Sequence, residues 1–302
     1  SSDVCSSDLV KNMKKKILIL GGTGFIGYHV AKESLKRKYE VTSISKNKPK
    51  KIRYLKDVNY IIGDISKKNF IKNKIKKNFD YVINLAGYVD HSNIIKTYKS
   101  HYIGCKNVSN FFLNKKIKKF IQIGSSMEYG FSKSPQNENL KCKPQSTYGK
   151  AKFLSTKYLL NLYKKKRFPV TILRLYQIYG PSQHLNRFIP IVINSCLANK
   201  NFFCSHGRQL RDFLYIDDLI NAIFLVFNNS KSTGEIINIG SGRGLKIKNI
   251  IKRIVNFYKA GNPQFGKINL RKEEQIKIYP NLYKARKDRK STRLNSSHVK
   301  RS

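Results

Sequence analysis

Short apolar runs that recur along the first half of the chain constrain its fold more than any other feature. Six of them lie at residues 17–20, 40–44, 60–62, 81–85, 120–123 and 170–173. Most end at a glycine or a small polar residue, and helices are expected between them, the first at about 25–37. Runs of this kind are typical of strands buried on both faces of a parallel sheet. The alternation predicts an α/β fold with a doubly wound, Rossmann-type parallel sheet.

Beyond about Gly180 this rhythm loosens, which predicts a smaller C-terminal region. That region contains the segment 211–218 and a helix expected near 219–227.

A glycine-rich turn, Gly21–Gly27, follows the first apolar run and opens a helix. Glycines permit a tight turn and let a phosphate approach the backbone, and a helix N-terminus offers free N–H groups to it. The spacing Gly21-x-x-Gly24-x-x-Gly27 differs from the commoner Gly-x-Gly-x-x-Gly pattern. Between a strand and a helix it nevertheless predicts a dinucleotide site. The residues assigned to it are Gly21, Thr23, Gly24, Phe25, Ile26 and Gly27.

The next strand ends carry further candidate cofactor contacts, because ligands bind at the carboxyl ends of parallel strands. The second strand ends in Ser45-Lys46 without an acidic residue, which favours NADP over NAD. The alternative is that Lys46 is a solvated lysine. Asp64 after the third strand suits a hydrogen bond from an adenine amino group, or else caps a turn. The remaining residues assigned to the cofactor cleft are Ile65, Leu85, Ala86 and Gly87.

Tyr148 and Lys152 form a Tyr-x-x-x-Lys pair, and Ser125 follows the fifth strand. Residues four apart share one face of a helix. A lysine ammonium beside a phenol is expected to lower the pKa of the phenol. A tyrosine tuned in this way passes a proton to or from a substrate oxygen. Alone the pair is a weak signal in a lysine-rich chain, but downstream of a dinucleotide turn it predicts a catalytic set of Ser125, Tyr148 and Lys152.

Taken in order, these segments resemble the extended short-chain dehydrogenase/reductase family, the NAD(P)-dependent nucleotide-sugar epimerases, dehydratases and reductases. The resemblance covers about 14–287 and rests on residues 21–27, 63–64, 84–87, 124–130, 148–152, 173–181 and 211–218. It implies that Tyr148 exchanges a proton with the sugar oxygen and that Ser125 bonds the same oxygen, with Ser126 as the alternative. It implies that Lys152 holds the nicotinamide ribose, so that Tyr148 and Lys152 also contact the cofactor. The implied substrate contacts are Ser125, Ser126, Gln177, Arg187 and Arg211.

For Arg211 the resemblance implies a contact with the nucleotide diphosphate, and the alternative is a salt bridge to Asp212 or Asp217. The implied domains are a mainly NAD(P)-binding part at 13–179 and a mainly nucleotide-sugar-binding part at 180–287, some of whose strands return to the sheet. The resemblance also implies a cytoplasmic homodimer that binds a nucleotide-diphosphate sugar. Its interface would be formed by helices at about 93–114 and 147–165.

Departures from the family pattern bear on the reaction. Dehydratases of the family carry an acidic pair directly after the active-site Ser/Thr, where this chain has Ser126 and Met127. Glu128 lies one position late, so dehydration is disfavoured unless the loop shifts by one residue. Gln177 stands where the family often has Asn. We therefore expect a 4-keto-6-deoxysugar 4-reductase, with a 4-epimerase as the alternative and a 4,6-dehydratase less favoured.

The net charge of +44 raises a different class of function, a non-catalytic module that binds RNA or protein. The lysines are scattered and accompany many Asn and Ile residues, which instead indicates an AT-rich genome. We expect no nucleic-acid partner. We also expect no metal site, because the cysteines have neither Cys-x-x-Cys spacing nor a histidine cluster. No apolar run approaches the roughly 18 residues of a transmembrane helix, so no membrane partner is expected.

The two ends of the sequence are interpreted as foreign segments. Residues 3–9 and 288–298 resemble translations of one sequencing-library adapter read on its two strands. We therefore exclude 1–12 and 288–302 from the fold prediction and take Met13 as the native start.

Overall fold

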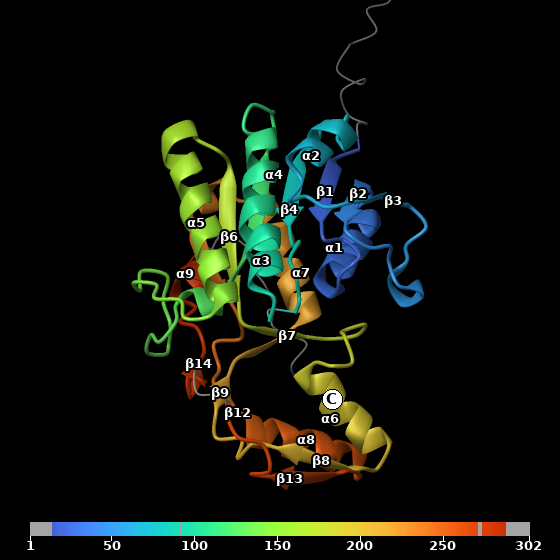
Figure 1. Cartoon of the computed structure of the whole chain (residues 1–302), viewed down its shortest axis with the longest axis vertical. Coiled ribbons are helices and arrows are strands. Elements are labelled where there is room, and N and C mark those ends of the chain that lie inside the picture. The colour runs from blue at the N-terminus through green and yellow to red at the C-terminus, as the bar shows by residue number, and fades with distance from the viewer. Residues whose placement is uncertain (1–13, 91, 271–273, 288–302) are drawn as a thin grey trace, which may run out of the picture.

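The computed structural model describes residues 14–90, 92–270 and 274–287, and its centre is a seven-stranded parallel sheet (Figure 1). The strands lie in the order β11-β6-β5-β4-β1-β2-β3, so the chain winds in opposite directions from the boundary between β1 and β4. This confirms the predicted fold class. The strands are β1 Lys16–Leu20, β2 Glu40–Ser45, β3 Val58–Ile62, β4 Tyr81–Asn84, β5 Lys119–Ser125, β6 Val170–Leu175 and β11 Ile236–Ile239.

Helices cover both faces of this sheet, which explains why its strands are mostly apolar. Successive side chains of a strand point to opposite faces. Ile17 and Ile19 of β1 pack in the core under α1 and α7, whereas Leu18 and Leu20 pack in the core under α2, α4 and α5. The helices are α1 Phe25–Lys36, α2 Lys68–Lys74, α3 Ile94–Tyr98, α4 Gly104–Phe112, α5 Thr147–Lys166 and α7 Ile216–Asn228. A π-helical turn, Lys99–Ile103, joins α3 to α4.

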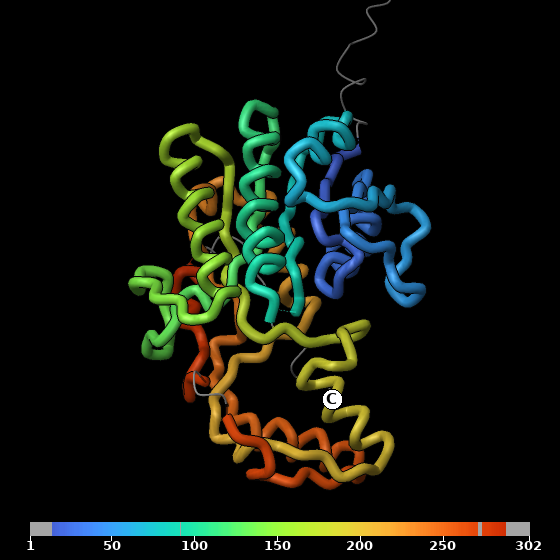
Figure 2. Tube along the Cα trace, in the orientation of Figure 1, coloured from blue at the N-terminus to red at the C-terminus, as the bar shows by residue number. Residues whose placement is uncertain are grey.

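The C-terminal elements form a smaller region below the sheet in Figure 1, with a core of its own that contains Val192, Cys196, Cys204 and Ile251. Figure 2 traces the chain as it passes between the sheet and this region: α7 and β11 follow residue 180 in sequence but belong to the sheet layer. The elements of the smaller region are β7 Gln177–Tyr179, α6 Phe188–Leu197, β8 Asn201–Cys204, β9 Leu210–Arg211, β10 Phe213–Tyr215, β12 Leu245–Lys246, α8 Ile247–Tyr258, β13 Asn262–Phe265 and β14 Lys277–Ile278. The last helix, α9 Tyr283–Lys287, instead lies against β11 of the sheet. The described residues also form three 3-10 turns: η1 Lys51–Arg53, η3 Ser126–Glu128 and η4 Ser230–Ser232.

None of the helices in the described part of the chain is long and apolar enough to cross a membrane. The predicted foreign ends and Met13 lie outside the described residues.

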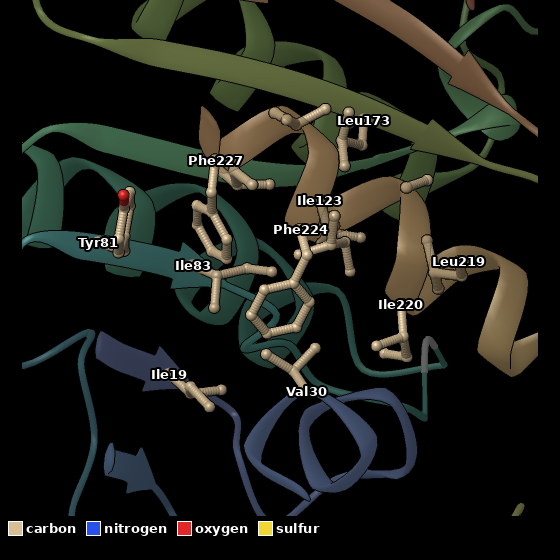
Figure 3. Close-up of a cluster of buried hydrophobic side chains, with 14 of the residues drawn as sticks. Ile19, Val30, Tyr81, Ile83, Ile123, Leu173, Leu219, Ile220, Phe224 and Phe227 are labelled. Carbon is tan, nitrogen blue, oxygen red and sulfur yellow. The ribbon is translucent and has the colours of Figure 1, made fainter. Parts of the chain in front are cut away.

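The core between the sheet and the pair α1 and α7 depends on large side chains from α7. Phe224 is 2% exposed, and its ring lies beside Val30 of α1 (Figure 3). The Arg37 guanidinium lies 4.3 Å from the centre of the same ring. Phe257 of α8 offers a matched comparison because it is 75% exposed.

We predict that Phe224→Ala lowers the free energy of unfolding by about 3–5 kcal/mol, because it removes buried apolar area and leaves a cavity. The control Phe257→Ala changes it by no more than about 0.5 kcal/mol, since the ring is already in water. Denaturant titration of the two variants measures both values. Equal losses would contradict the assignment of Phe224 to the core.

Candidate active site

The glycine-rich turn lies where β1 and β4 end, at the point where the order of the strands reverses. Gly21 has a φ of +86°, and a Cβ there would lie 2.9 Å from the Ala86 nitrogen. A Cβ on Gly27 would lie 2.3 Å from the Gly21 oxygen, so α1 packs directly on the turn. Gly24 is the N-cap of α1 and has no side chain to cover the first N–H groups. The turn therefore offers a cradle that fits the pyrophosphate of a dinucleotide.

The ends of β2 and β3 lie next to this turn. Ser45 Oγ accepts a hydrogen bond from the Thr23 nitrogen at 3.2 Å. Lys46 is largely exposed, and its Nζ lies 3.2 Å from Asp64 Oδ2. Asp64 also caps its own turn, because its Oδ1 accepts the Ser66 backbone N–H at 2.9 Å. Partial burial works to raise the pKa of Asp64, but the bonds from Ser66 and Lys46 outweigh it and the net shift is downward.

Arg53 is a residue that the sequence analysis missed. It is buried, and it bridges the glycine-rich turn to the loop after β7 through the Thr23 oxygen at 3.3 Å and the Ser182 oxygen at 3.1 Å. A single arginine in a lysine-rich loop carries no signal in the sequence that distinguishes it from solvated neighbours.

The candidate catalytic residues come from the end of β5 and the start of α5. Ser125 ends β5, and Tyr148 and Lys152 lie on one face of α5, whose N-cap Ser146 accepts the Gly149 N–H at 3.1 Å. A Cβ on Gly149 would lie 2.5 Å from the Met127 oxygen, so the helix packs tightly against the turn after Ser125. The structure thus brings the three predicted residues to one end of the sheet.

The expected lowering of the Tyr148 pKa by Lys152 is not what the structure gives. Burial raises the pKa of Tyr148, and a hydrogen bond with Ser125 only partly opposes this effect. The Lys152 ammonium donates to the Ile123 oxygen at 2.7 Å and lies 5.9 Å from the centre of the Tyr148 ring. Burial in turn lowers the pKa of Lys152 to about 8. With Lys152 bound to the Ile123 oxygen, burial decides the direction in which the pKa of Tyr148 shifts.

His101 also belongs to this group and was missed in the sequence. Its ring packs edge-on against Tyr148, with 5.0 Å between the ring centres. It lies in the π-helical turn, and its Nε2 donates to the Tyr88 oxygen at 3.2 Å. A Cβ on Gly87 would lie 2.1 Å from His101 Cε1, which explains the glycine after β4. A lone histidine gave no signal, because only the fold places it beside Tyr148.

The candidate substrate residues have different surroundings. Ser126 is half-buried, whereas Gln177 on β7 and Arg187 before α6 are exposed. The positive charge of Arg187 acts to lower the Tyr148 pKa, although burial prevails. Arg211 is buried and pairs with Glu274.

The two partners considered for Arg211 in the sequence were wrong. Asp212 instead accepts hydrogen bonds from the Ser241 nitrogen at 2.8 Å and the Arg243 nitrogen at 3.0 Å. Glu274 pairs with Arg211 because β14, three residues further on, runs beside β9.

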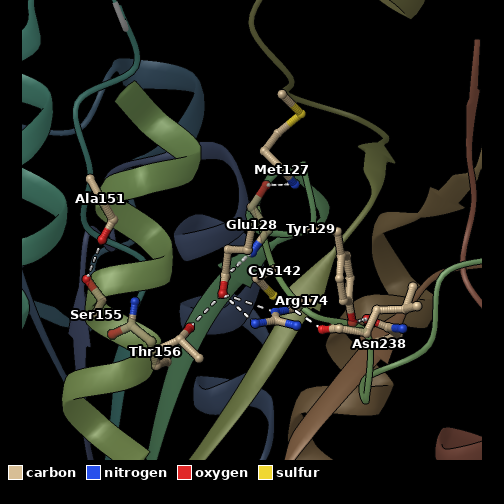
Figure 4. Close-up of polar contacts among 12 residues, drawn as sticks. Met127, Glu128, Tyr129, Cys142, Ala151, Ser155, Thr156, Arg174 and Asn238 are labelled. Carbon is tan, nitrogen blue, oxygen red and sulfur yellow. Dashed lines mark hydrogen bonds and ion pairs between the residues drawn. The ribbon is translucent and has the colours of Figure 1, made fainter. Parts of the chain in front are cut away.

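Glu128, the carboxylate closest in sequence to Ser125, is fully buried and forms an ion pair with Arg174 of β6 at 2.9 Å (Figure 4). Its other oxygen accepts the Ser125 backbone N–H at 2.9 Å. The loop is therefore not shifted by one residue, and Glu128 does not take the position of a dehydratase acid or base. Among the described residues no group of three or more His, Cys, Asp or Glu side chains could hold a metal ion.

Comparison with known proteins agrees with this arrangement. The model of the NAD dependent epimerase/dehydratase family matches residues 17–240. The dTDP-D-glucose 4,6-dehydratase of Dictyostelium discoideum is 30% identical over 274 residues, which cover 80% of this chain and only 62% of that longer protein.

Two solved structures extend the likeness. The UDP-glucose 4-epimerase of Thermotoga maritima has a TM-score of 0.85 at 24% identity and covers 90% of this chain and 91% of its own. The UDP-glucuronic acid 4-epimerase of Bacillus cereus, solved with UDP-glucuronic acid and NAD, has a TM-score of 0.79 at 26% identity and covers 90% and 92%.

The doubly wound sheet with a glycine-rich turn at its switch point defines a Rossmann-type α/β protein. The chain belongs to the NAD dependent epimerase/dehydratase family and is an enzyme of that family. The resemblance to the family of NAD(P)-dependent sugar epimerases and dehydratases is thereby confirmed, and the alternative of a non-catalytic binding module is set aside.

The buried Lys152 predicts a pH-dependent stability. Burial lowers its pKa from the ordinary 10.5 of a lysine to about 8, so the unfolded chain binds the proton more tightly. The cost of burying the charge is therefore complete below pH 8 and disappears as the pH rises towards 10.5. We predict that Lys152→Met is more stable than the wild type at pH 7 by up to about 3 kcal/mol, and that the difference shrinks above pH 8.

Denaturant titration across this pH range measures the difference between the two proteins. The control Lys150→Met, at an exposed position on the same helix, should leave stability unchanged at every pH. A constant offset between Lys152→Met and the wild type would contradict the lowered pKa.

Proposed function

We propose that the enzyme oxidises or reduces C4 of a nucleotide-diphosphate sugar without eliminating water, and that its favoured reaction is reduction of a 4-keto-6-deoxysugar. The observation that carries this proposal is the meeting of Ser125, Tyr148 and Lys152 at one end of the sheet, followed by Ser126 and Met127 rather than an acidic pair. The nearest carboxylate, Glu128, is held in an ion pair with Arg174. Among the described residues, neither the Ser126-Met127 pair nor Glu128 therefore supplies the acid and base that dehydration needs.

The cofactor in this proposal is NADP, with NAD as the alternative. Gly21, Gly24 and Gly27 would hold its pyrophosphate, and Asp64 the adenine. When bound, the nicotinamide dinucleotide supplies the hydride that reduces C4 or accepts the one that oxidises it. The proposal of NADP rests on Ser45 and Lys46 at the end of β2, because an ammonium attracts a 2′-phosphate. NAD is supported by the Bacillus cereus enzyme, which was solved with NAD.

The chain's own residues would manage the proton and the orientation of the substrate. The Tyr148 hydroxyl donates its proton to the carbonyl oxygen at C4, and the Ser125 hydroxyl binds the same oxygen. Lys152 holds the nicotinamide ribose. Ser126, Gln177 and the Arg187 guanidinium face the sugar and its phosphates in this proposal, since guanidinium groups suit phosphate.

Arg211 would bind the nucleotide diphosphate after exchanging its Glu274 partner. The scattered positive charge of the chain favours capture of such an anionic substrate.

A 4-epimerase is the second candidate, and the likeness to the Bacillus cereus 4-epimerase favours it. It would use the same three residues but regenerate its cofactor within each turnover. The proposal also includes a cytoplasmic homodimer that packs α3, α4 and α5 against their copies. Ile94 and Ile95 on α3 are exposed in the isolated chain, which agrees with such a contact.

The reaction is tested with dTDP-4-keto-6-deoxyglucose and NADPH. We predict that the enzyme oxidises one NADPH for each sugar reduced, and that Tyr148→Phe lowers kcat by at least about a hundredfold because the proton donor is lost. Absorbance at the NADPH band together with NMR of the product measures both. Interconversion of UDP-glucose and UDP-galactose without net change in cofactor would contradict reduction and support epimerisation as the reaction.

The cofactor proposal is tested at Lys46. We predict that Lys46→Ala weakens NADPH binding by about tenfold or more, since it removes a charge beside the 2′-phosphate, and leaves NADH binding within about twofold. Titration calorimetry with the two cofactors measures the ratio. Lys48→Ala, two residues further along the same loop, is the control. An equal loss for NADH, or none for NADPH, would reject a role for Lys46 in cofactor choice.

A further inference from the structure

Glu128 is a buried carboxylate that the proposed reaction does not use, three residues after Ser125. Its Oε1 accepts the Ser125 backbone N–H at 2.9 Å. In return, Ser125 Oγ accepts the Met127 N–H at 3.2 Å, which completes a reciprocal capping box. The backbone and the hydroxyl of Ser125 are therefore both oriented by the turn that contains Glu128.

The second oxygen of Glu128 connects this turn to two other elements. Oε2 accepts the Thr156 hydroxyl of α5 at 2.8 Å and the Arg174 Nε of β6 at 3.0 Å (Figure 4). Thr156 lies one helical turn after Lys152 and two turns after Tyr148, so all three lie on the same face of α5. The Glu128 carboxylate thus links Ser125 to α5, the helix that carries Tyr148 and Lys152.

The backbone is built to admit this carboxylate. A Cβ on Gly124 would lie 2.6 Å from Glu128 Oε1 and 3.1 Å from Arg174 Cγ. Any larger residue at position 124 would push the carboxylate away from the Ser125 nitrogen. The glycine before Ser125 is therefore explained by Glu128.

Charged and titratable groups surround Glu128 from each packed element. They are Arg174 on β6, Tyr148 and Lys152 on α5, Tyr129 after the turn and Cys142 in the following loop. Burial raises the pKa of Tyr148, and the negative charge of Glu128 adds to that rise. Burial lowers the pKa of Lys152, and the charge of Glu128 opposes it. The carboxylate therefore favours the protonated form of both groups.

We propose that Glu128 is a positioning residue for proton transfer: it fixes Ser125 directly, and through Thr156 it holds α5 so that Tyr148 and Lys152 stay in register with Ser125. It does not touch the substrate. The proposal rests on the proposed function in one respect only, the role of Tyr148 as proton donor.

Thr156→Val tests the link to α5, because it removes one hydrogen bond and leaves the Glu128–Arg174 pair intact. With dTDP-4-keto-6-deoxyglucose and NADPH we expect kcat to fall by about tenfold or more while KM stays within about twofold, since misplaced groups slow chemistry more than binding. Thr156→Ser keeps the hydroxyl and should restore kcat to within about twofold of the wild type. The matched control is Thr171→Val, which removes a buried hydroxyl that donates to the Ser232 oxygen at 2.8 Å, away from the site.

A second measurement does not need turnover. The phenol of Tyr148 is titrated in the full chain by ¹³C NMR of ring-labelled tyrosine, with the signal assigned by its absence in Tyr148→Phe. In Glu128→Gln we expect the pKa of Tyr148 to fall below that of the wild type, because a neighbouring negative charge is gone. If Glu128→Gln does not fold, because Arg174 is left unpaired, Thr156→Val carries the test.

An equal loss of kcat in Thr156→Val and Thr171→Val would overturn the proposal, as would an unchanged titration of Tyr148 in a folded Glu128→Gln. If the wild-type enzyme does not turn over the chosen sugar but the Tyr148 pKa falls in Glu128→Gln as expected, the proposed reaction is rejected. The influence of Glu128 on Tyr148 is then retained.

Discussion

The buried ion pair between Glu128 and Arg174 is the interaction on which the carboxyl end of the sheet depends. Removing two charges from water is costly, and only good geometry with further hydrogen bonds compensates for it. Here Glu128 accepts bonds from three directions, and the Arg174 guanidinium lies 4.4 Å from the centre of the Tyr129 ring. Tyr129 in turn donates to Asn238 of β11 at 2.7 Å. The pair therefore ties β5, β6, β11 and α5 together where the candidate catalytic residues lie.

The glycine-rich turn and the Glu128 network place the two halves of the site by different means. The turn relies on the absence of side chains: Gly21 and Gly27 let β1, β4 and α1 approach one another closely. The network relies on charge and hydrogen bonds within the core. Arg53 connects the first half to the loop after β7, which leads to Arg187. Arg53 thus joins the glycine-rich turn to the loop after β7.

Local sequence patterns predicted the strands of the sheet and the glycine-rich turn. They did not report contacts between segments that are distant in the sequence. The six apolar runs predicted β1 to β6 because most side chains of these strands are buried, whereas the short β11 stood in a region of looser rhythm. His101 contacts Tyr148, and Arg53 bonds the Ser182 oxygen, only because the fold brings these distant residues together. Glu274, the partner of Arg211, is 63 residues away in sequence. Tyr148 itself was predicted, but its pKa depends on burial, which spacing alone does not report.

Burial and the negative charge of Glu128 act on the pKa of Tyr148 in the same direction. Burial and the charge of Glu128 both favour the protonated phenol, so Tyr148 carries its proton at neutral pH. A protonated phenol is ready to donate to a carbonyl oxygen, which is what reduction at C4 requires at its first proton transfer. Oxidation of a C4 hydroxyl requires the opposite, a phenolate that accepts a proton. In both proposed reactions the charge of Glu128 therefore acts on the group that exchanges the proton.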